Sequence, residues 1–168
     1  YQKTTFTPEK NYALINIKLH KFDDAAYRKA ADAGQGYNAP KYTEGEIKLD
    51  TAPTFSSGSV TYEKFAIIQH TSGDGKTGRG HFIAYISHNG EWYYISDNTL
   101  EIWTQDKIDA LQKSTIANVI YKKRGARVTD KPPVAISNSV GNTCFYNSLL
   151  QVLFNIPEFT ELITTAAA

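Results

Sequence analysis

The chain has 168 residues, of which 41% are hydrophobic and 21% charged, and its formal net charge at pH 7 is +1. This length predicts one domain, and the composition is that of an ordinary globular protein. The near-neutral charge gives no overall attraction to nucleic acid or to an acidic membrane surface. A single cysteine excludes an internal disulfide framework and a multi-cysteine zinc site, so we expect no metal and no cofactor.

The first sixty residues predict two strands and one helix. Residues 12–20, "YALINIKLH", alternate apolar and polar side chains, which is typical of a half-buried strand. Residues 23–34 predict a short helix that ends at Gly34. Residues 35–59 are rich in Gly, Pro, Ser and Thr, and only "GEIKLD" at 45–50 resembles a strand there.

The middle of the chain predicts a hairpin between two further strands. A strand at 60–70 leads into the glycine-rich loop "TSGDGKTGRG" at 71–80. The strands "HFIAYIS" and "EWYYIS", joined by the turn "HNG", predict a hairpin over 81–96. A helix capped by Thr104 is expected over 104–113, followed by a strand over 114–123.

The last third of the chain predicts a linker and two helices. The segment "RGARVTDKPP" contains two consecutive prolines and several turn formers, which indicates a linker. Thr143 is a suitable N-cap for an amphipathic helix over 144–154, and Asn155 and Pro157 then start a second helix. The predicted fold class is α+β, an antiparallel sheet of five or six strands packed against the cysteine-bearing helix.

Cys144 is the residue with the most specific chemistry. At the first position of a helix, free backbone N–H groups and the positive end of the helix dipole favour a thiolate. The same N–H groups point to where an oxyanion forms when the thiolate attacks a carbonyl. Acyl transfer of this kind also needs a base, a group that orients the base, and a second oxyanion donor.

Five positions before the helix can supply those groups. His81 follows the glycine-rich loop at the start of a strand, and is the best candidate for the base. Ser96 and Asp97 end the partner strand, so the hairpin returns them close to His81 as candidate orienting groups. Asn138 and Ser139 precede the cysteine by six and five residues, and either can donate to the oxyanion.

Two stretches closely resemble the motifs of one enzyme family. "GNTCFYNSLLQVLFNIPEF" resembles the Cys box of the ubiquitin-specific proteases, and "FAIIQHTSGDGKTGRGHFIAYISHNGEWYYISDNTLEIW" resembles their His box. "YALINIKLHKFD" and "GEIKLD" are similar to strands of their palm, so the resemblance covers about 11–125 and 133–163. It implies a papain-like cysteine protease fold, and an enzyme that cleaves after the C-terminal Gly-Gly of ubiquitin or a relative.

The chain departs from this family in the order of its parts. The family runs from Cys box to His box, whereas here the His box comes first, which implies a circular permutation. The insertion that forms the family's zinc-bearing fingers is missing. The implied layout is one catalytic domain, 1–168, with a palm-like part at 11–125, a linker at 126–135, and the Cys box and helix at 136–168.

The resemblance also leaves two site positions open. Counted from Trp92, the family's acidic or amide positions fall on Ser96 and Asp97, and we expect Asp97 to orient the base because an ionised carboxylate stabilises imidazolium better than a hydroxyl. The family's oxyanion Asn falls on Ser139, but a one-residue insertion brings Asn138 there, which we favour. Gly80 is expected to bind substrate, at the end of a loop that forms one wall of a narrow channel.

The expected function is therefore that of a thiol-dependent deubiquitinase. Its expected partners are ubiquitin or a ubiquitin-like modifier and its conjugates, with no nucleic acid and no membrane, and the protein is expected to be a cytoplasmic monomer or an effector delivered into a host cell. One alternative is a SUMO-type or adenoviral cysteine protease, which has the order His, Asp, Cys and the same chemistry. The others are a catalytically weak ubiquitin-binding module and a cysteine-dependent acyltransferase or protease of unrelated peptides.

Overall fold

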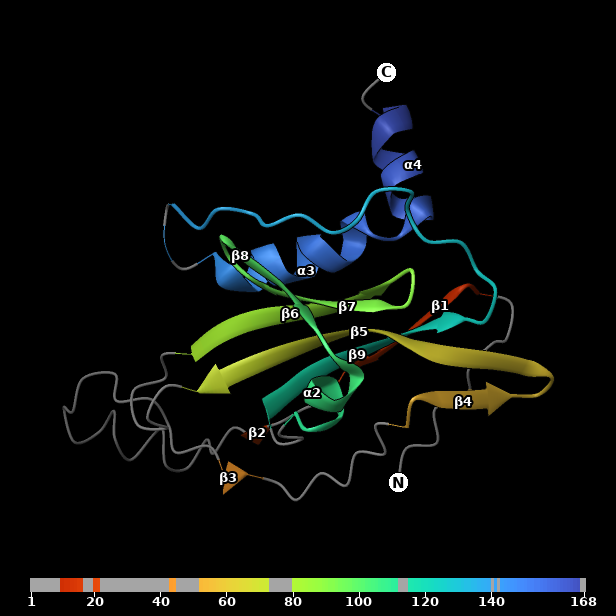
Figure 1. Ribbon diagram of the computed structural model, residues 1–168, viewed down its shortest axis with the longest axis horizontal. Coiled ribbons are helices and arrows are strands. Elements are labelled where there is room, and N and C mark those ends of the chain that lie inside the picture. The colour runs from red at the N-terminus through yellow and green to blue at the C-terminus, as the bar shows by residue number, and fades with distance from the viewer. Residues whose placement is uncertain are drawn as a thin grey trace.

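The computed structural model describes residues 10–16, 20–21, 43–44, 52–72, 80–111, 115–139, 141 and 143–166. The fold mixes antiparallel strands with helices (Figure 1). Its elements, in chain order, are β1 (Tyr12–Asn16), β2 (His20–Lys21), β3 (Thr43–Glu44), β4 (Thr54–Ser57), β5 (Val60–Ser72), β6 (Gly80–His88), β7 (Glu91–Ser96), β8 (Thr99–Trp103), α2 (Gln105–Asp109), β9 (Ile116–Lys123), α3 (Cys144–Phe154) and α4 (Pro157–Ala166). No helix within these ranges has the length and apolar character needed to cross a membrane.

The strands form one large sheet and one small one. The large sheet has the order β1-β9-β5-β6-β7-β8, with β4 paired to β5, and every pairing in it is antiparallel. The strands β2 and β3 pair with each other only, in the described part of the chain. The predicted antiparallel sheet with a cysteine-bearing helix packed on it is confirmed, since α3 contacts β6, β7 and β5.

The predicted hairpin forms for the reason that its turn residues indicate. His88 pairs with Glu91, which leaves Asn89 and Gly90 as a two-residue loop, and both have positive φ, 51° and 86°. Such a loop matches the right-handed twist of the flanking strands, and Asn-Gly adopts it at little steric cost. The strand start that carries His81 and the strand end that carries Ser96 therefore lie side by side in the sheet.

The sequence prediction missed two strands of the large sheet, as well as the short strand β3, and placed one helix end wrongly. The strands β4 and β8 were not predicted, so the sheet has seven strands rather than five or six. Helix α2 ends at Asp109 instead of residue 113, and Thr104 makes no side-chain capping bond to it. The helix predicted at 23–34 and the strand predicted at 45–50 lie outside the described residues.

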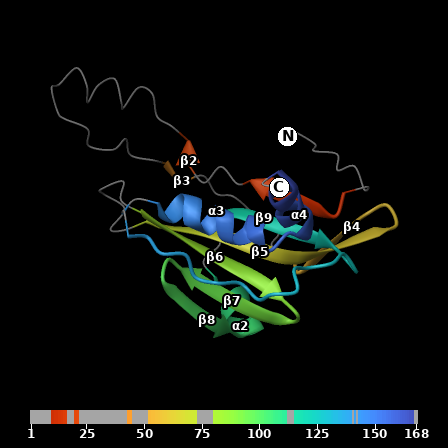
Figure 2. The ribbon, with the colours of Figure 1, turned by 90° about the horizontal axis from the view of Figure 1, so that it is seen from above.

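Two apolar layers, one on each face of the sheet, make up the core. Consecutive residues of β5 belong to different layers. Ile67 lies in the layer that includes Ile108 of α2, and Ile68 lies in the layer under α3. Seen from above, α3 lies over the sheet (Figure 2). Its Val152 is 2% exposed within that layer, and complete burial of such a side chain contributes roughly 1.5–3 kcal/mol.

The segment between β9 and α3 contains no helix or strand in its described residues, and it is fixed to the domain at several points. The Tyr12 hydroxyl donates to the carbonyl of Arg127, and His88 Nε2 bonds the carbonyl of Thr129 at 2.8 Å. Burial raises the pKa of Tyr12, with the nearby Glu158 carboxylate as a second cause, so this hydroxyl remains a donor throughout the physiological range. These contacts hold the segment along the edge of the domain on its way to Cys144.

Candidate active site

Cys144 is the first residue of α3 and is partly buried. Thr143 occupies the N-cap position as predicted, but its side chain does not cap the helix. Its hydroxyl and its backbone N–H both donate to Oδ1 of Asn138, the latter at 3.3 Å. The predicted capping bond is therefore wrong, and Thr143 has φ −100° and ψ 3°, outside the extended conformation that an N-cap residue usually adopts.

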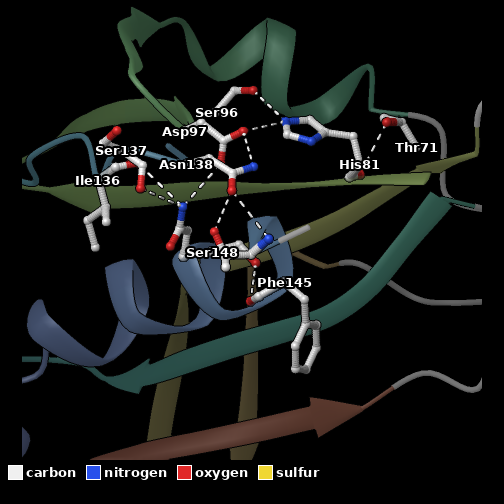
Figure 3. A network of polar contacts seen from close by, with 11 residues as sticks. Thr71, His81, Ser96, Asp97, Ile136, Ser137, Asn138, Phe145 and Ser148 are labelled. Atoms are coloured by element: carbon white, nitrogen blue, oxygen red, sulfur yellow. Dashed lines mark hydrogen bonds and ion pairs between the residues drawn. The ribbon is translucent and has the colours of Figure 1, made fainter. Parts of the chain in front are cut away.

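His81 lies at the start of β6 with a 37% exposed side chain. Its Nε2 is 2.8 Å from Oγ of Ser96 and 3.8 Å from Oδ2 of Asp97 (Figure 3). The Thr71 hydroxyl donates to the His81 carbonyl at 3.2 Å and fixes the backbone on the other side. The sequence favoured Asp97 as the orienting group, whereas in this geometry the hydrogen-bonded partner of the ring is Ser96.

The position of Asp97 follows from a tight turn between β7 and β8. Ser96 pairs with Thr99, so Asp97 and Asn98 form a two-residue loop between β7 and β8. Asp97 has φ 48°, a left-handed conformation in which Asp is tolerated better than most residues. Its carboxylate consequently leaves the line of the strand and accepts hydrogen bonds from Asn138 Nδ2 at 3.0 Å and Asn147 Nδ2 at 3.2 Å.

Asn138 joins the two halves of the site. Its Oδ1 accepts from Thr143, next to Cys144, and its Nδ2 donates to Asp97, next to His81. The neighbouring turn is closed by a bond from the Gly141 N–H to the Asn138 carbonyl at 3.2 Å. A single side chain thus connects the loop before α3 to the end of β7, across 41 residues of sequence.

The other predicted residues lie nearer the edge of the site. Ser139 is exposed, and follows Asn138 in the loop before Gly141. Asn147, which the sequence reading did not include, is 8% exposed on α3 one turn after Cys144. The spacing of three residues along a helix places it on the same face as the cysteine, and that is the signal that could have identified it.

Gly80 precedes His81 and has a steric reason to be glycine. A Cβ atom built there would lie 1.8 Å from Nε2 of His70, which belongs to the neighbouring strand. The His70 ring stacks on Phe82 at 4.4 Å between centroids, and Phe82 meets Phe145 edge-to-face at 5.1 Å. The glycine therefore allows a row of rings that reaches the residue after the cysteine.

Replacing Gly80 with alanine is expected to displace the His70 ring and to destabilise the protein. Over-packing of this kind costs about 1–3 kcal/mol, measurable as a lower urea midpoint at unchanged m-value. The double variant Gly80→Ala/His70→Ala is the control, because it removes the atom that the new methyl group meets. An equal loss of stability with and without His70 would contradict the steric explanation.

No three His, Cys, Asp or Glu side chains gather closely enough to hold a metal ion in the described ranges of the chain. The polar cluster consists instead of a thiol, an imidazole, one carboxylate and several amides and hydroxyls. Such a set can perform nucleophilic and acid–base chemistry without help from a metal.

Comparison with known proteins gives a match at the cysteine-bearing end of the chain. The family described as Ubiquitin carboxyl-terminal hydrolase matches residues 136–168, about a fifth of the sequence. This segment resembles that family. It contains Cys144, Asn138, Ser139 and Asn147, four residues that the site brings together or near one another. No curated protein matches the chain.

Several solved structures also match. The structure of the Ubp8-Sgf11-Sgf73-Sus1 SAGA DUB module matches with a TM-score of 0.47 and 13% identity, over 70% of this chain and 25% of that chain. A second structure of this module matches with a TM-score of 0.49 and 13% identity, over 70% and 24%. A third, bound to monoubiquitin, has a TM-score of 0.47 and 13% identity, again over 70% and 24%. The chain spans about a quarter of the length of these structures.

Proposed function

We propose that the protein is a thiol-dependent deubiquitinase that hydrolyses the bond after the C-terminal glycine of ubiquitin or a ubiquitin-like modifier. The observation that carries the proposal is the bridge through Asn138, whose amide bonds both Thr143, beside Cys144, and Asp97, beside His81. It joins a candidate nucleophile and a candidate base that are far apart in the sequence. The family match over 136–168 supplies the substrate class.

In the first half of the reaction, Cys144 is the nucleophile. Its Sγ attacks the carbonyl carbon of the terminal glycine, and its proton passes to His81. Because Nε2 of His81 is bonded to Ser96, Nδ1 is the ring nitrogen left to take this proton. The tetrahedral intermediate collapses when the C–N bond to the substrate lysine breaks, and His81 returns the proton to the departing amine.

In the second half, water hydrolyses the thioester. His81 takes a proton from the water as its oxygen attacks the acyl carbon, and the C–S bond breaks. His81 passes its proton to the departing sulfur, which regenerates the Cys144 thiol, and the modifier's new carboxylic acid loses its proton to water. While His81 carries a proton, its Nε2–H donates to the Ser96 hydroxyl, and the Asp97 carboxylate at 3.8 Å stabilises the positive charge through space.

The oxyanion needs donors near the start of α3. The backbone N–H of Cys144 is one, because the first N–H groups of a helix have no partner within it. Asn138 can be the second if its Nδ2 exchanges the bond to Asp97 for one to the oxyanion. Ser139, which is exposed, can instead turn its hydroxyl toward the substrate. Within this proposal Gly80 lies against the modifier's tail, whereas residues 73–79 of the loop that precedes it lie outside the described part of the chain.

The proposal includes the reversed order of the two halves. A His box that precedes the Cys box, without the fingers insertion, describes a circularly permuted domain, and the close approach of the loop before α3 to the end of β7 supports it. Within this proposal the protein acts as a monomer in the cytoplasm, its own or that of a host cell.

The test is the reaction with ubiquitin carrying an electrophile at its C-terminus, followed by intact mass spectrometry. The proposal expects an adduct of one ubiquitin per chain, formed at the single cysteine. Adducts with another Gly-Gly-ended modifier, but not with ubiquitin, would change the substrate and keep the mechanism. If no modifier reacts, the proposal fails. Ser96 as the hydrogen-bonded partner of His81 favours the second candidate, a binding module with weak turnover, which then stands if ubiquitin still binds.

A further inference from the structure

The polar cluster contains an amide that the reaction scheme above does not use. Asn147 Nδ2 donates to Oδ1 of Asp97 at 3.2 Å, and it also approaches the carbonyls of Ile136 and Ser137 at 3.5 and 3.4 Å. Its side chain is 8% exposed, whereas the Asp97 side chain is 22% exposed. A buried amide that faces three acceptors from two separate segments is fixed in one orientation.

This contact differs from an ordinary bond in the core because of its acceptor. Asp97 has φ 48° in a two-residue turn, so its backbone alone does not direct the carboxylate toward His81. Oδ2 is 3.8 Å from His81 Nε2, while Oδ1 is bonded to Asn147. With Oδ1 held by the helix, the carboxylate plane keeps Oδ2 on the side of the imidazole.

We propose that Asn147 is a positioning residue of the active site, acting on the reaction through Asp97. It holds the Asp97 carboxylate against α3, and so keeps one negative charge at a set distance from the protonated form of His81. The inference deepens the proposed function and rests on it for the identity of the nucleophile and the base. Asn138 makes a parallel bond to Oδ2, but Asn138 can leave it to serve the oxyanion, whereas Asn147 lies beneath the site and remains.

The chemical consequence concerns the reactivity of the thiol. A thiolate–imidazolium pair reacts with neutral alkylating reagents at pH values where an isolated thiol does not. The Asp97 carboxylate, 3.8 Å from His81 Nε2, attracts the positive charge that the ring carries in such a pair. Loss of the Asn147 bond lets the carboxylate rotate toward water, so we expect the reaction of Cys144 to become slower below neutral pH.

The first experiment is a double-mutant cycle on the rate of reaction with iodoacetamide at pH 6. Asn147→Ala is expected to slow the reaction by about tenfold, the equivalent of one hydrogen bond to a charged group. In an Asp97→Ala background the same change is expected to have no further effect. If Asn147→Ala slowed alkylation equally in the wild-type and Asp97→Ala backgrounds, or did not slow it at all, the inference would be overturned.

Asn147→Asp gives a readout that a purely structural role would not produce. The substitution is nearly isosteric but places a second carboxylate against Asp97, and repulsion opposes the ionisation of both carboxylates at this distance. At low pH they share a proton, which restores the hydrogen bond, and as pH rises the proton is lost and the pair is driven apart. The rate relative to wild type is expected to fall as pH rises. A ratio independent of pH would contradict the proposal.

Ser148→Ala is the matched control. Ser148 neighbours Asn147 on α3 and is 4% exposed, but its hydroxyl donates to the Phe145 carbonyl within the helix. Its replacement is expected to leave the alkylation rate and its pH profile unchanged. Thermal unfolding of each variant, measured alongside, identifies any loss of rate that is due to unfolding.

The alkylation assay also separates this inference from the proposed function. Iodoacetamide reacts without any modifier, so an Asp97-dependent effect of Asn147 supports the inference even if ubiquitin forms no adduct. Conversely, an adduct with ubiquitin together with additive effects of Asn147→Ala and Asp97→Ala keeps the proposed function and rejects the positioning role.

Discussion

Cys144→Ala is expected to abolish hydrolysis of a ubiquitin-tail substrate, a loss of about 10⁴-fold or more, because no other group can form the thioester. The chain contains no other cysteine, so adduct formation with a tail electrophile should disappear completely. Hydrolysis of a fluorogenic ubiquitin-tail substrate and intact mass measure the two effects. Folding should be preserved, since the side chain is small and only partly buried at the helix start.

A binding measurement distinguishes the loss of the nucleophile from the loss of the surface that binds ubiquitin. The alanine variant is expected to bind ubiquitin with an affinity close to that of the wild type, because the modifier's body does not contact the sulfur. Calorimetry with the variant measures this directly. Hydrolysis that persists in Cys144→Ala would mean that another residue performs the chemistry, and would remove the protease proposal.

His81→Ala is expected to lower the rate of hydrolysis by about 10²–10⁴-fold, the usual contribution of a general base. The ring is 37% exposed, so its removal leaves a gap open to solvent. Added imidazole should therefore restore part of the rate, in proportion to its concentration and to the fraction present as neutral base. Steady-state rates with and without imidazole test this.

His88→Ala is the matched control for this histidine. His88 is on the same strand but is 4% exposed, and it bonds the Thr129 carbonyl. Its loss is expected to lower the free energy of unfolding by about 1–3 kcal/mol, because the buried ring and its bond to the partly buried Thr129 carbonyl are removed. The rate at low temperature should change little, and imidazole should not alter it. If His81→Ala instead lost stability and kept its rate, His81 would not be the base.

The sequence was sufficient to predict those elements whose structure depends on residues close together in the chain. Asn89-Gly90 predicts the tight turn, and the apolar runs in β5 and β6 predict buried strands, because these signals act within a few residues. The apolar spacing of α3 and the proline at the start of α4 predicted both helices for the same reason. These elements place His81, Ser96 and Cys144 on the sheet and helix that carry them.

The parts that sequence could not supply depend on partners distant in the chain. β8 has an exposed outer edge and no clear alternation, and its pairing with β7 turns Asp97 out of the strand. The Thr143 hydroxyl has two available partners, the helix and Asn138, and the choice depends on how the loop folds against Asp97. The role proposed for Asn147 likewise depends on a carboxylate 50 residues earlier.

The order of the chain has a consequence for synthesis. All strands from β1 to β9 leave the ribosome before α3, so the sheet can form while the apolar layer that receives Val152 is still uncovered. His81 is synthesised before Cys144, and the two residues come near each other only when α3 packs against the sheet. A nascent chain that ends at residue 139 would therefore expose the apolar layer on this face of its sheet until α3 is synthesised and packs against it.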